Sequence, residues 1–444
     1  MCTELILRFE YGSLVPWIER SNEGGLTAVG GPHMVVLRTP APLHGEDFRT
    51  VGEFTVGAGE TIPFTLSYGP SYEPRPRPVD PERALQDTEA FWRRWSARCA
   101  PAGPWSDVVK RSLVVLKGLT YAPTGGIVAA PTTSLPERIG GVRNWDYRFC
   151  WLRDTTFTLL ALMNAGYYDE AKAWRDWLLR AAAGSPEQLQ VLYGVGGERR
   201  MSEWEVPWLP GYEASGPVRI GNAAVDQTQL DIYGEVIDAL YHAFEHGLPA
   251  VARGNAIIQA LLEHLATIWH EADEGIWEVR GPAQQFTHSK VMAWVAFDRA
   301  VKIVERGVMG GPIARWRRLR DDIHADICRR AFNPTLGSFV QAYGSDALDA
   351  SLLLLPLVGF LPPEDPRIVG TVRAIERDLL VNGFVLRYDT DKGHDGLPSG
   401  EGAFLPCSFW LADNLVLQGR IAEAGALFQR LVALTNDVGL LAEE

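Results

Sequence analysis

The chain has 444 residues and 46% of them are apolar, so it can bury a large core shared between one large domain and a smaller one. Its 55 acidic residues exceed its 42 basic ones, and the net charge of −13 argues against partners such as nucleic acid or an anionic membrane. The five cysteines are scattered, the first residues lack a signal-peptide pattern, and no apolar run could span a bilayer. We therefore expect a cytoplasmic protein.

The first part of the chain has a β pattern. Short β-branched or alternating runs predict strands at Glu4–Phe9, Met34–Arg38, Val51–Val56 and Thr61–Ser67. The last two runs flank Gly57–Glu60, which is typical of a β-hairpin turn. Because four short strands are too few for a stable sandwich, we expect residues 1–72 to be a partial antiparallel β-sandwich domain that lacks its first strands.

Residues 73–104 are predicted to connect this domain to the rest of the chain. The proline-rich run Glu73–Pro81 is typical of a stiff linker, and Ala84–Trp95 has a helical pattern.

From residue 105 onward the periodicity is almost wholly helical. Helices are predicted at 106–121, 153–165, 168–183, 226–246, 252–272, 288–306, 312–332, 348–358, 367–379, 404–418 and 421–435. Short turns containing Gly or Pro join many of them into antiparallel pairs, a pattern that favours an (α/α)6 barrel. Roughly eleven helices are one short of such a barrel, so we expect residues 105–444 to be a catalytic barrel domain that is incomplete at its C-terminal end.

Three non-helical stretches are too long to be simple connections in a compact domain. They are Pro123–Asn144, Leu192–Ile220 and Asp389–Gly402. In a barrel of helical pairs, such loops form a funnel at one end, where function is most often found.

The segment from Gly140 to Asp154 combines aromatic residues, arginines and aspartates directly before a helical pattern. Aromatic faces cover the apolar side of a sugar ring, and a paired Arg and Asp bind its hydroxyl groups. The alternative is a helix start with Asp154 near the N-cap and the aromatic rings in the core. This segment alone favours neither interpretation.

Two further acidic segments are candidates for chemistry. Trp277 precedes Glu278 and provides apolar surroundings that raise a carboxyl pKa and favour a general acid. Glu443 and Glu444 end the chain, where acidic residues are usually solvated. Two carboxyl groups distant in sequence can still meet across a barrel mouth, as glycoside hydrolysis requires.

Other reaction classes have little support in the sequence. The nine histidines show no metal-ligand spacing, and no nucleotide-binding loop or serine nucleophile motif is present. The run Asp321–Asp326 has a weak similarity to the metal-binding aspartates of prenyl-transfer enzymes with α/α toroids. Neighbouring arginines favour a solvated helix face instead.

Several long motifs, in order, resemble glycoside hydrolase family 15, which contains glucoamylases, glucodextranases and bacterial trehalases. They are Ala129–Glu137, Arg143–Asp154, Tyr193–Glu198, Arg219–Ala224, Gly275–Glu278 and Glu401–Trp410. The resemblance covers nearly the whole chain and implies an (α/α)6 barrel preceded by a β-sandwich. It also implies an inverting, exo-acting α-glucoside hydrolase that releases glucose from trehalose or from the non-reducing end of α-glucans.

The resemblance also implies roles for individual residues. Glu278 matches the general acid and Glu443 the general base. The residues expected to bind the sugar are Tyr147, Trp151, Arg153, Asp154, Trp277 and Arg387. The implied chemistry needs no cofactor and no metal ligand. It leaves open a dependence on Mg²⁺ or phosphate, the oligomeric state, and the choice between trehalose and α-glucans.

This chain departs from the family pattern at both ends. The Tyr-Asp that usually follows the base is missing together with the last barrel helix, so we expect a fragment of a longer protein. A base so near the end motivates an alternative, a glucoside-binding protein without turnover. A metal-dependent prenyl-transfer or cyclase enzyme is a remote third hypothesis.

Overall fold

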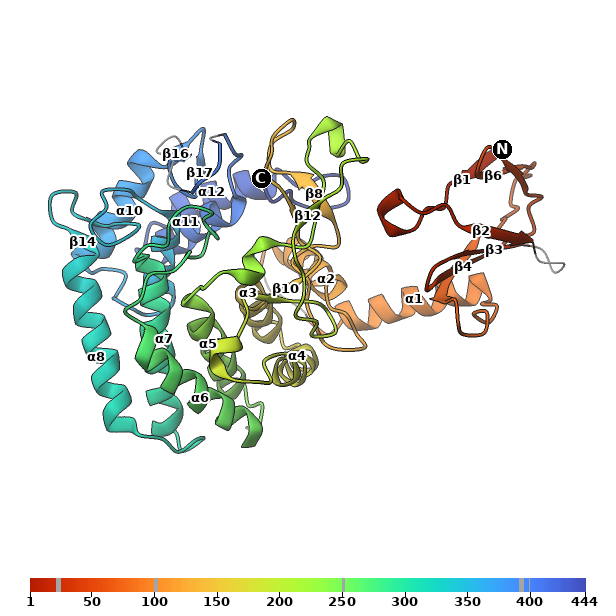
Figure 1. The fold of residues 1–444 in the computed structure, drawn as a ribbon. Coiled ribbons are helices and arrows are strands. Elements are labelled where there is room, and N and C mark those ends of the chain that lie inside the picture. Colours follow the sequence, from red (N-terminus) through yellow and green to blue (C-terminus); the bar gives the residue numbers. More distant parts are fainter. Residues whose placement is uncertain (21–24, 100–102, 250–251, 391–394, 399) are drawn as a thin grey trace. The chain divides into compact units, whose positions relative to one another are not determined.

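The computed structural model describes residues 1–444 apart from 21–24, 100–102, 250–251, 391–394 and 399. Part of the expected linker (100–102) and of the expected Asp389–Gly402 loop (391–394 and 399) thus lies outside the described residues. The chain forms two compact units (Figure 1). The first contains Met1–Ala97 with Val206–Leu209, and the second contains Arg98–Glu205 with Pro210–Glu444.

The first unit contains two antiparallel sheets. One has the order β1 (Cys2–Leu5), β6 (Arg49–Glu53), β5 (His44–Glu46). The other has the order β2 (Trp17–Arg20), β3 (Leu26–Gly30), β4 (His33–Arg38), β7 (Thr65–Pro70). A small core of Leu26, Ala28 and Leu37 packs against Leu5, Leu7, Phe9 and Leu43.

The predicted hairpin around Gly57–Glu60 is wrong. The strand before it, β6, pairs with β1 and β5, whereas the strand after it, β7, pairs with β4 in the other sheet. The turn itself forms: Glu60 N–H donates to the Gly57 carbonyl and the Glu60 carboxylate accepts from Gly57 N–H. The turn forms its hydrogen bonds between its own residues, so it does not determine which strands pair.

Helix α1 (Pro81–Ser96) follows the proline-rich segment, as expected. Its N-cap is Asp80, whose side chain accepts hydrogen bonds from the backbone N–H groups of Glu82 and Arg83, and proline occupies the first helical position. Both features are typical of a strong helix start.

All eleven helices predicted after residue 105 are present in the second unit. They are α2 (Ser106–Gly118), α3 (Leu152–Asn164), α4 (Tyr168–Ala181), α5 (Asp231–Glu245), α6 (Ala252–Ile268), α7 (Thr287–Glu305), α8 (Ile313–Arg330), α9 (Leu354–Leu357), α10 (Pro366–Asp378), α11 (Leu405–Leu417) and α12 (Ile421–Val432). Helix α9 is short because the first half of its segment, Ala350–Leu353, is a 3-10 turn.

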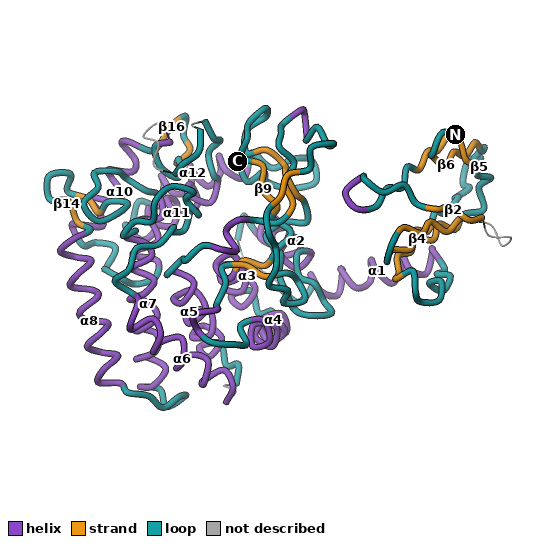
Figure 2. Tube along the Cα trace, in the orientation of Figure 1, coloured by secondary structure: helices purple, strands orange, loops and turns teal. Residues whose placement is uncertain are grey.

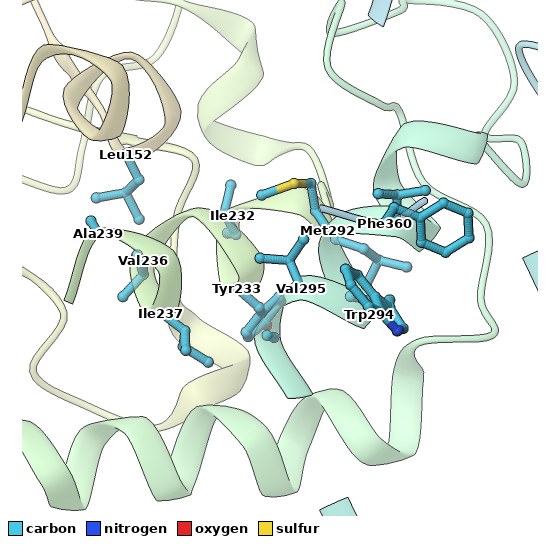
Figure 3. Close-up of a cluster of buried hydrophobic side chains, with 14 of the residues drawn as sticks. Leu152, Ile232, Tyr233, Val236, Ile237, Ala239, Met292, Trp294, Val295 and Phe360 are labelled. Atoms are coloured by element: carbon cyan, nitrogen blue, oxygen red, sulfur yellow. The ribbon is translucent and has the colours of Figure 1, made fainter. Parts of the chain in front are cut away.

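The helices form the two layers of an (α/α)6 toroid, which confirms the predicted fold. Nearly every residue of α5 and α7 is buried, and these helices pack against each other with α3 and α9 beside them. Figure 3 shows the apolar side chains that join these helices, among them Leu152, Val236 and Val295. Helices α8, α10 and α12 bury only one face, as outer helices do. Within the described ranges, no helix combines the length and apolarity needed to cross a membrane.

Short strand pairs organise the long loops of the second unit (Figure 2). These are β8 (Thr133–Pro136) with β9 (Asn144–Asp146), β10 (Cys150–Trp151) with β11 (Leu192–Tyr193), β12 (Trp204–Glu205) with β13 (Arg219–Ile220), β14 (Phe332–Asn333) with β15 (Ser338–Phe339), and β16 (Leu380–Val381) with β17 (Phe384–Val385). The three long loops contact one another: Thr133 Oγ1 donates to the Arg219 carbonyl, and Arg143 forms an ion pair with Asp395.

Candidate active site

Trp151, Arg153 and Asp154 lie where strand β10 passes into helix α3. Pairing of Trp151 with Leu192 fixes the end of the strand, and Trp151 is then the N-cap residue of α3. Arg153 and Trp151 are buried, whereas Asp154 is exposed in the first turn of the helix. An acidic residue in the first turn is favourable because it faces the positive end of the helix dipole.

Glu278 lies in a tight turn with a constrained backbone. Its φ angle is 55°, in the left-handed region, which costs a non-glycine residue about 1–2 kcal/mol. The turn is held by Glu278 N–H, which donates to the Gly275 carbonyl, and by Gln227 Nε2, which donates to the carbonyl groups of Glu278 and Val279. Strain that is held in this way often marks a functional position.

The carboxyl group of Glu278 meets the α3 residues directly. Its Oε1 accepts a hydrogen bond of 2.7 Å from Trp151 Nε1 and one of 3.2 Å from Arg153 Nη2. Burial raises the pKa of Glu278 above its usual range, although Arg153 and the Trp151 hydrogen bond lower it; the charge of Asp154 raises it further. The group therefore holds its proton to a higher pH than an ordinary glutamate does.

The Arg153 guanidinium is fixed on its other side by α5 and the preceding loop. Its Nη1 donates to Gln229 Oε1 over 2.9 Å and to Asp231 Oδ2 over 3.1 Å. The Asp231 side chain is fully buried, and only a tenth of the Arg153 side chain is exposed. Arg153 thus bridges two carboxylates, Asp231 and Glu278.

Glu443 lies in the same charged neighbourhood. Its carbonyl group accepts a hydrogen bond of 2.9 Å from Leu405 N–H at the start of α11. Its side chain reaches solvent, yet the surrounding protein raises the pKa of the carboxyl group to about 7 by desolvation, with Arg387 opposing and the charges of Glu137 and Asp154 adding to the shift. Burial by the surrounding protein and the two like charges thus favour the protonated form of this carboxyl group.

Tyr147 lies near both candidate catalytic groups, Glu278 and Glu443. Its ring centroid is 5.9 Å from that of Trp151. Burial raises the pKa of its hydroxyl group, and the charges of Glu443, Glu137 and, more weakly, Glu278 raise it further. The charge of Asp154 also raises the pKa of both Glu278 and Glu443. The sequence-predicted residues of the Arg143–Asp154 segment therefore lie near both carboxyl groups.

Arg387 is bound by three carboxylates. Its Nη2 contacts Glu137 Oε2 at 3.0 Å, Glu401 Oε2 at 2.7 Å and Glu444 Oε1 at 2.9 Å, and its Nε donates to Glu401 Oε1. Glu444 Oε2 also accepts a hydrogen bond from Gly402 N–H. These contacts tie residues 443 and 444 to the loop before α11. The arginine expected to bind sugar thus also anchors the segment that carries Glu443.

Trp277 packs in an aromatic cluster beside the Glu278 turn. Its Nε1 donates to both carboxylate oxygens of Asp349, at 2.9 and 3.0 Å. Its ring contacts Phe404 and Trp410, and the Arg387 guanidinium lies 5.7 Å from the ring centroid. The indole N–H is thereby occupied, so Trp277 can meet a sugar only through its ring.

Sequence reasoning missed four acidic residues that complete this arrangement. Glu137 and Glu401 stand at the ends of two of the family-like motifs, which is the one sequence signal for them. Glu444 has no signal beyond its place beside Glu443 at the end of the sequence. Asp231 fell inside an expected helix, and nothing in the sequence indicated its contact with Arg153.

The described residues offer little for metal binding. Among them, no group of three or more His, Cys, Asp or Glu side chains is arranged to hold a metal ion. The Asp321–Asp326 run lies on the outer helix α8, where Arg320 binds Asp321, and Arg329 and Arg330 bind Asp326. Asp321 and Asp322 are exposed, as the neighbouring arginines predicted, whereas Asp326 is buried and its carboxylate is paired with Arg329 and Arg330.

Comparisons with known proteins agree with the motifs. A trehalase of Mycobacterium tuberculosis is 42% identical over 390 residues, which is 87% of this chain and 57% of the relative. A trehalase of Mycolicibacterium smegmatis is 42% identical over 412 residues, covering 90% of this chain and 60% of the relative. The chain thus spans about three fifths of the length of these relatives.

Solved structures support the same fold. A bacterial glucoamylase in complex with acarbose matches with a TM-score of 0.71 at 15% identity, covering 97% of this chain and 70% of that one. At this identity the likeness establishes the fold alone. Residues 103–442 match the family described as Glycosyl hydrolases family 15. Because this match covers most of the chain, the protein belongs to Glycosyl hydrolases family 15.

Proposed function

We propose that this protein hydrolyses α,α-trehalose to glucose with inversion at the attacked anomeric carbon. The observation that carries the proposal is the carboxyl group of Glu278, which is desolvated, held in a strained turn and bound by Trp151 and Arg153. Six relatives that are 33–42% identical to this chain carry the name trehalase, which supports the choice of substrate.

In this mechanism protonated Glu278 is the general acid. It donates its proton to the oxygen that links the two glucose rings, so that one glucose leaves as a neutral alcohol. The raised pKa of Glu278 favours the protonated form that this step needs. The negative charge of Asp154 stabilises the positive charge that develops on the other ring in the transition state.

Ionised Glu443 is the general base. It takes a proton from a water molecule that attacks the anomeric carbon from the face opposite to the leaving group. Inverting pairs of carboxyl groups are about 6.5–9.5 Å apart, because this water lies between the base and the sugar. The two carboxyl groups and water complete the reaction, which therefore needs no cofactor.

The test is to supply trehalose, maltotriose and isomaltotriose separately and to follow glucose release, with and without Mg²⁺ and phosphate. Proton NMR early in the reaction should show equal amounts of α- and β-glucose from trehalose, because inversion changes one of the two α-linked carbons. Release of α-glucose alone would contradict inversion. Glucose release from maltotriose or isomaltotriose but not from trehalose would contradict the substrate, and binding of trehalose without hydrolysis would support the non-catalytic alternative.

A further inference from the structure

The side chain of Asp231 is fully buried, and an ion pair of 3.1 Å with Arg153 links it to the candidate site. Asp231 Oδ2 binds Arg153 Nη1, whereas Asp231 Oδ1 has no hydrogen-bond partner among the described residues. A buried carboxylate is costly unless its charge is compensated. The positive charge that compensates Asp231 is that of the Arg153 guanidinium.

We propose that Asp231 is a positioning residue that holds the Arg153 guanidinium against Glu278 and offsets its positive charge there. This inference rests on the proposed role of Glu278 as the general acid. A guanidinium 3.2 Å from a carboxyl group favours the ionised carboxylate, which cannot donate a proton. A second, fully buried carboxylate 3.1 Å from the same guanidinium opposes that effect.

The other groups near Arg153 do not supply this charge. Glu235 lies on α5 one turn after Asp231, and burial together with the charges of Asp231 and Asp238 raises its pKa well above the usual range. His288 on α7 is buried, and desolvation lowers its pKa to about 4. Both shifts therefore favour the neutral form of the group. Asp154 on α3 is exposed, so solvent screens its charge more than that of Asp231.

On the Glu278 side the facing groups are Tyr147, Trp151 and Gln229. The hydroxyl pKa of Tyr147 is raised, so this group stays neutral as well. Trp151 and Gln229 carry no charge. The charged groups that act on Glu278 are thus Arg153 and Asp154, and Asp231 acts through its ion pair with Arg153.

The test compares pH profiles of kcat/KM for trehalose in the wild-type protein and in Asp231→Asn. The asparagine keeps the shape and an acceptor for Arg153 but removes the charge. We expect the alkaline limb, on which Glu278 loses its proton, to move down by about 1 pH unit. A purely structural ion pair would lower the melting temperature and leave the limb in place, which would overturn the proposal.

Two further variants keep the test decisive. Asp349→Asn is the matched control: Asp349 is also buried and binds the neighbouring Trp277, so the limb should stay in place. Gln229→Glu adds a carboxylate at the same Arg153 Nη1 and should move the limb up, which tests the proposal even if Asp231→Asn does not fold.

A measurement without turnover separates this inference from the proposed function. In protein labelled with ¹³C at the glutamate carboxyl carbons, the Glu278 resonance is assigned by its loss in Glu278→Gln. Its titration midpoint should be lower in Asp231→Asn than in the wild-type protein, whatever the substrate. An unchanged midpoint would refute the role of Asp231, whereas absence of glucose release with a shifted midpoint would refute only the proposed function.

Discussion

Trp151 Nε1 donates a 2.7 Å hydrogen bond to Glu278 Oε1, although 127 positions separate the two residues in the chain. Trp151 is itself fixed by its β10–β11 pairing and by the start of α3. Glu278 is fixed by a strained turn. The bond therefore joins two rigid parts of the toroid and defines the direction in which the Glu278 carboxyl group can donate its proton.

Trp151→Phe removes this bond while retaining an aromatic ring. The bond lowers the pKa of Glu278 because it favours the carboxylate, so its loss should move the alkaline limb of the pH profile upward. We also expect kcat to fall by about tenfold, because the acid is less well oriented. The pH dependence of kcat and kcat/KM for trehalose measures both effects. A limb that moves to lower pH would contradict the assignment of this hydrogen bond to the acid.

Glu278→Gln keeps the shape of the side chain but cannot donate a proton to the leaving oxygen. We expect turnover of trehalose to fall by about 10²–10⁴-fold, while binding of glucose measured by calorimetry stays near the wild-type value. Glu274→Gln is the matched control, since Glu274 lies in the same turn region and accepts from Thr228 N–H, away from Arg153 and Trp151. A decrease of less than tenfold in Glu278→Gln would remove Glu278 from the acid role.

Glu443 should set the acidic limb of the profile. A general base must be ionised, and the pKa of Glu443 is raised to about 7, so kcat/KM should increase as the pH rises through about 7. Glu443→Gln should lose most of the activity. Addition of azide, a small anion that can attack the anomeric carbon without a base to deprotonate it, should restore some turnover. An acidic limb that stays near the ordinary glutamate range in the wild-type protein would contradict the environment described for Glu443.

The helices were predictable because their signals are local. The repeat of apolar residues in segments such as 288–306 reflects burial against the neighbouring helix, and the observed bounds of α7 differ from it by one residue at each end. The strand pairing of the first unit was harder to predict. Strand β2 is exposed throughout and lacks an apolar alternation. Strands β6 and β7 pair in different sheets, which the turn that separates them does not reveal.

The same difference between local signals and distant contacts applies to the candidate site. Motif resemblance predicts roles for Tyr147, Arg153 and Glu278 because their neighbours in sequence form recognisable runs. The groups that hold them were not visible, because each owes its importance to a distant partner. Glu137 meets Arg387 across 250 positions, and Asp231 meets Arg153 across 78. A carboxylate without a sequence signature becomes interpretable only when the fold shows which cation it faces.

The last prediction concerns Glu444, which anchors the segment that carries Glu443. Its side chain is 3% exposed and lies beside Glu137 and Glu401, so burial and these charges raise its pKa despite the contact with Arg387. A carboxyl group with a raised pKa in the folded state binds more protons there than in the unfolded chain. Its contribution to the free energy of unfolding is complete below the ordinary glutamate pKa of 4.5 and is lost as the pH rises through the raised value.

Glu444→Gln removes this titration and keeps the size of the side chain. The melting temperature of the wild-type protein should therefore fall more steeply between about pH 4.5 and pH 8 than that of the variant. Glu423→Gln on α12 is the control: Glu423 pairs with Arg420 at the surface and its pKa is lowered, so its titration lies below this window and the slope should match the wild type. Parallel melting curves for the wild-type protein and Glu444→Gln across the whole window would show that Glu444 does not carry a raised pKa.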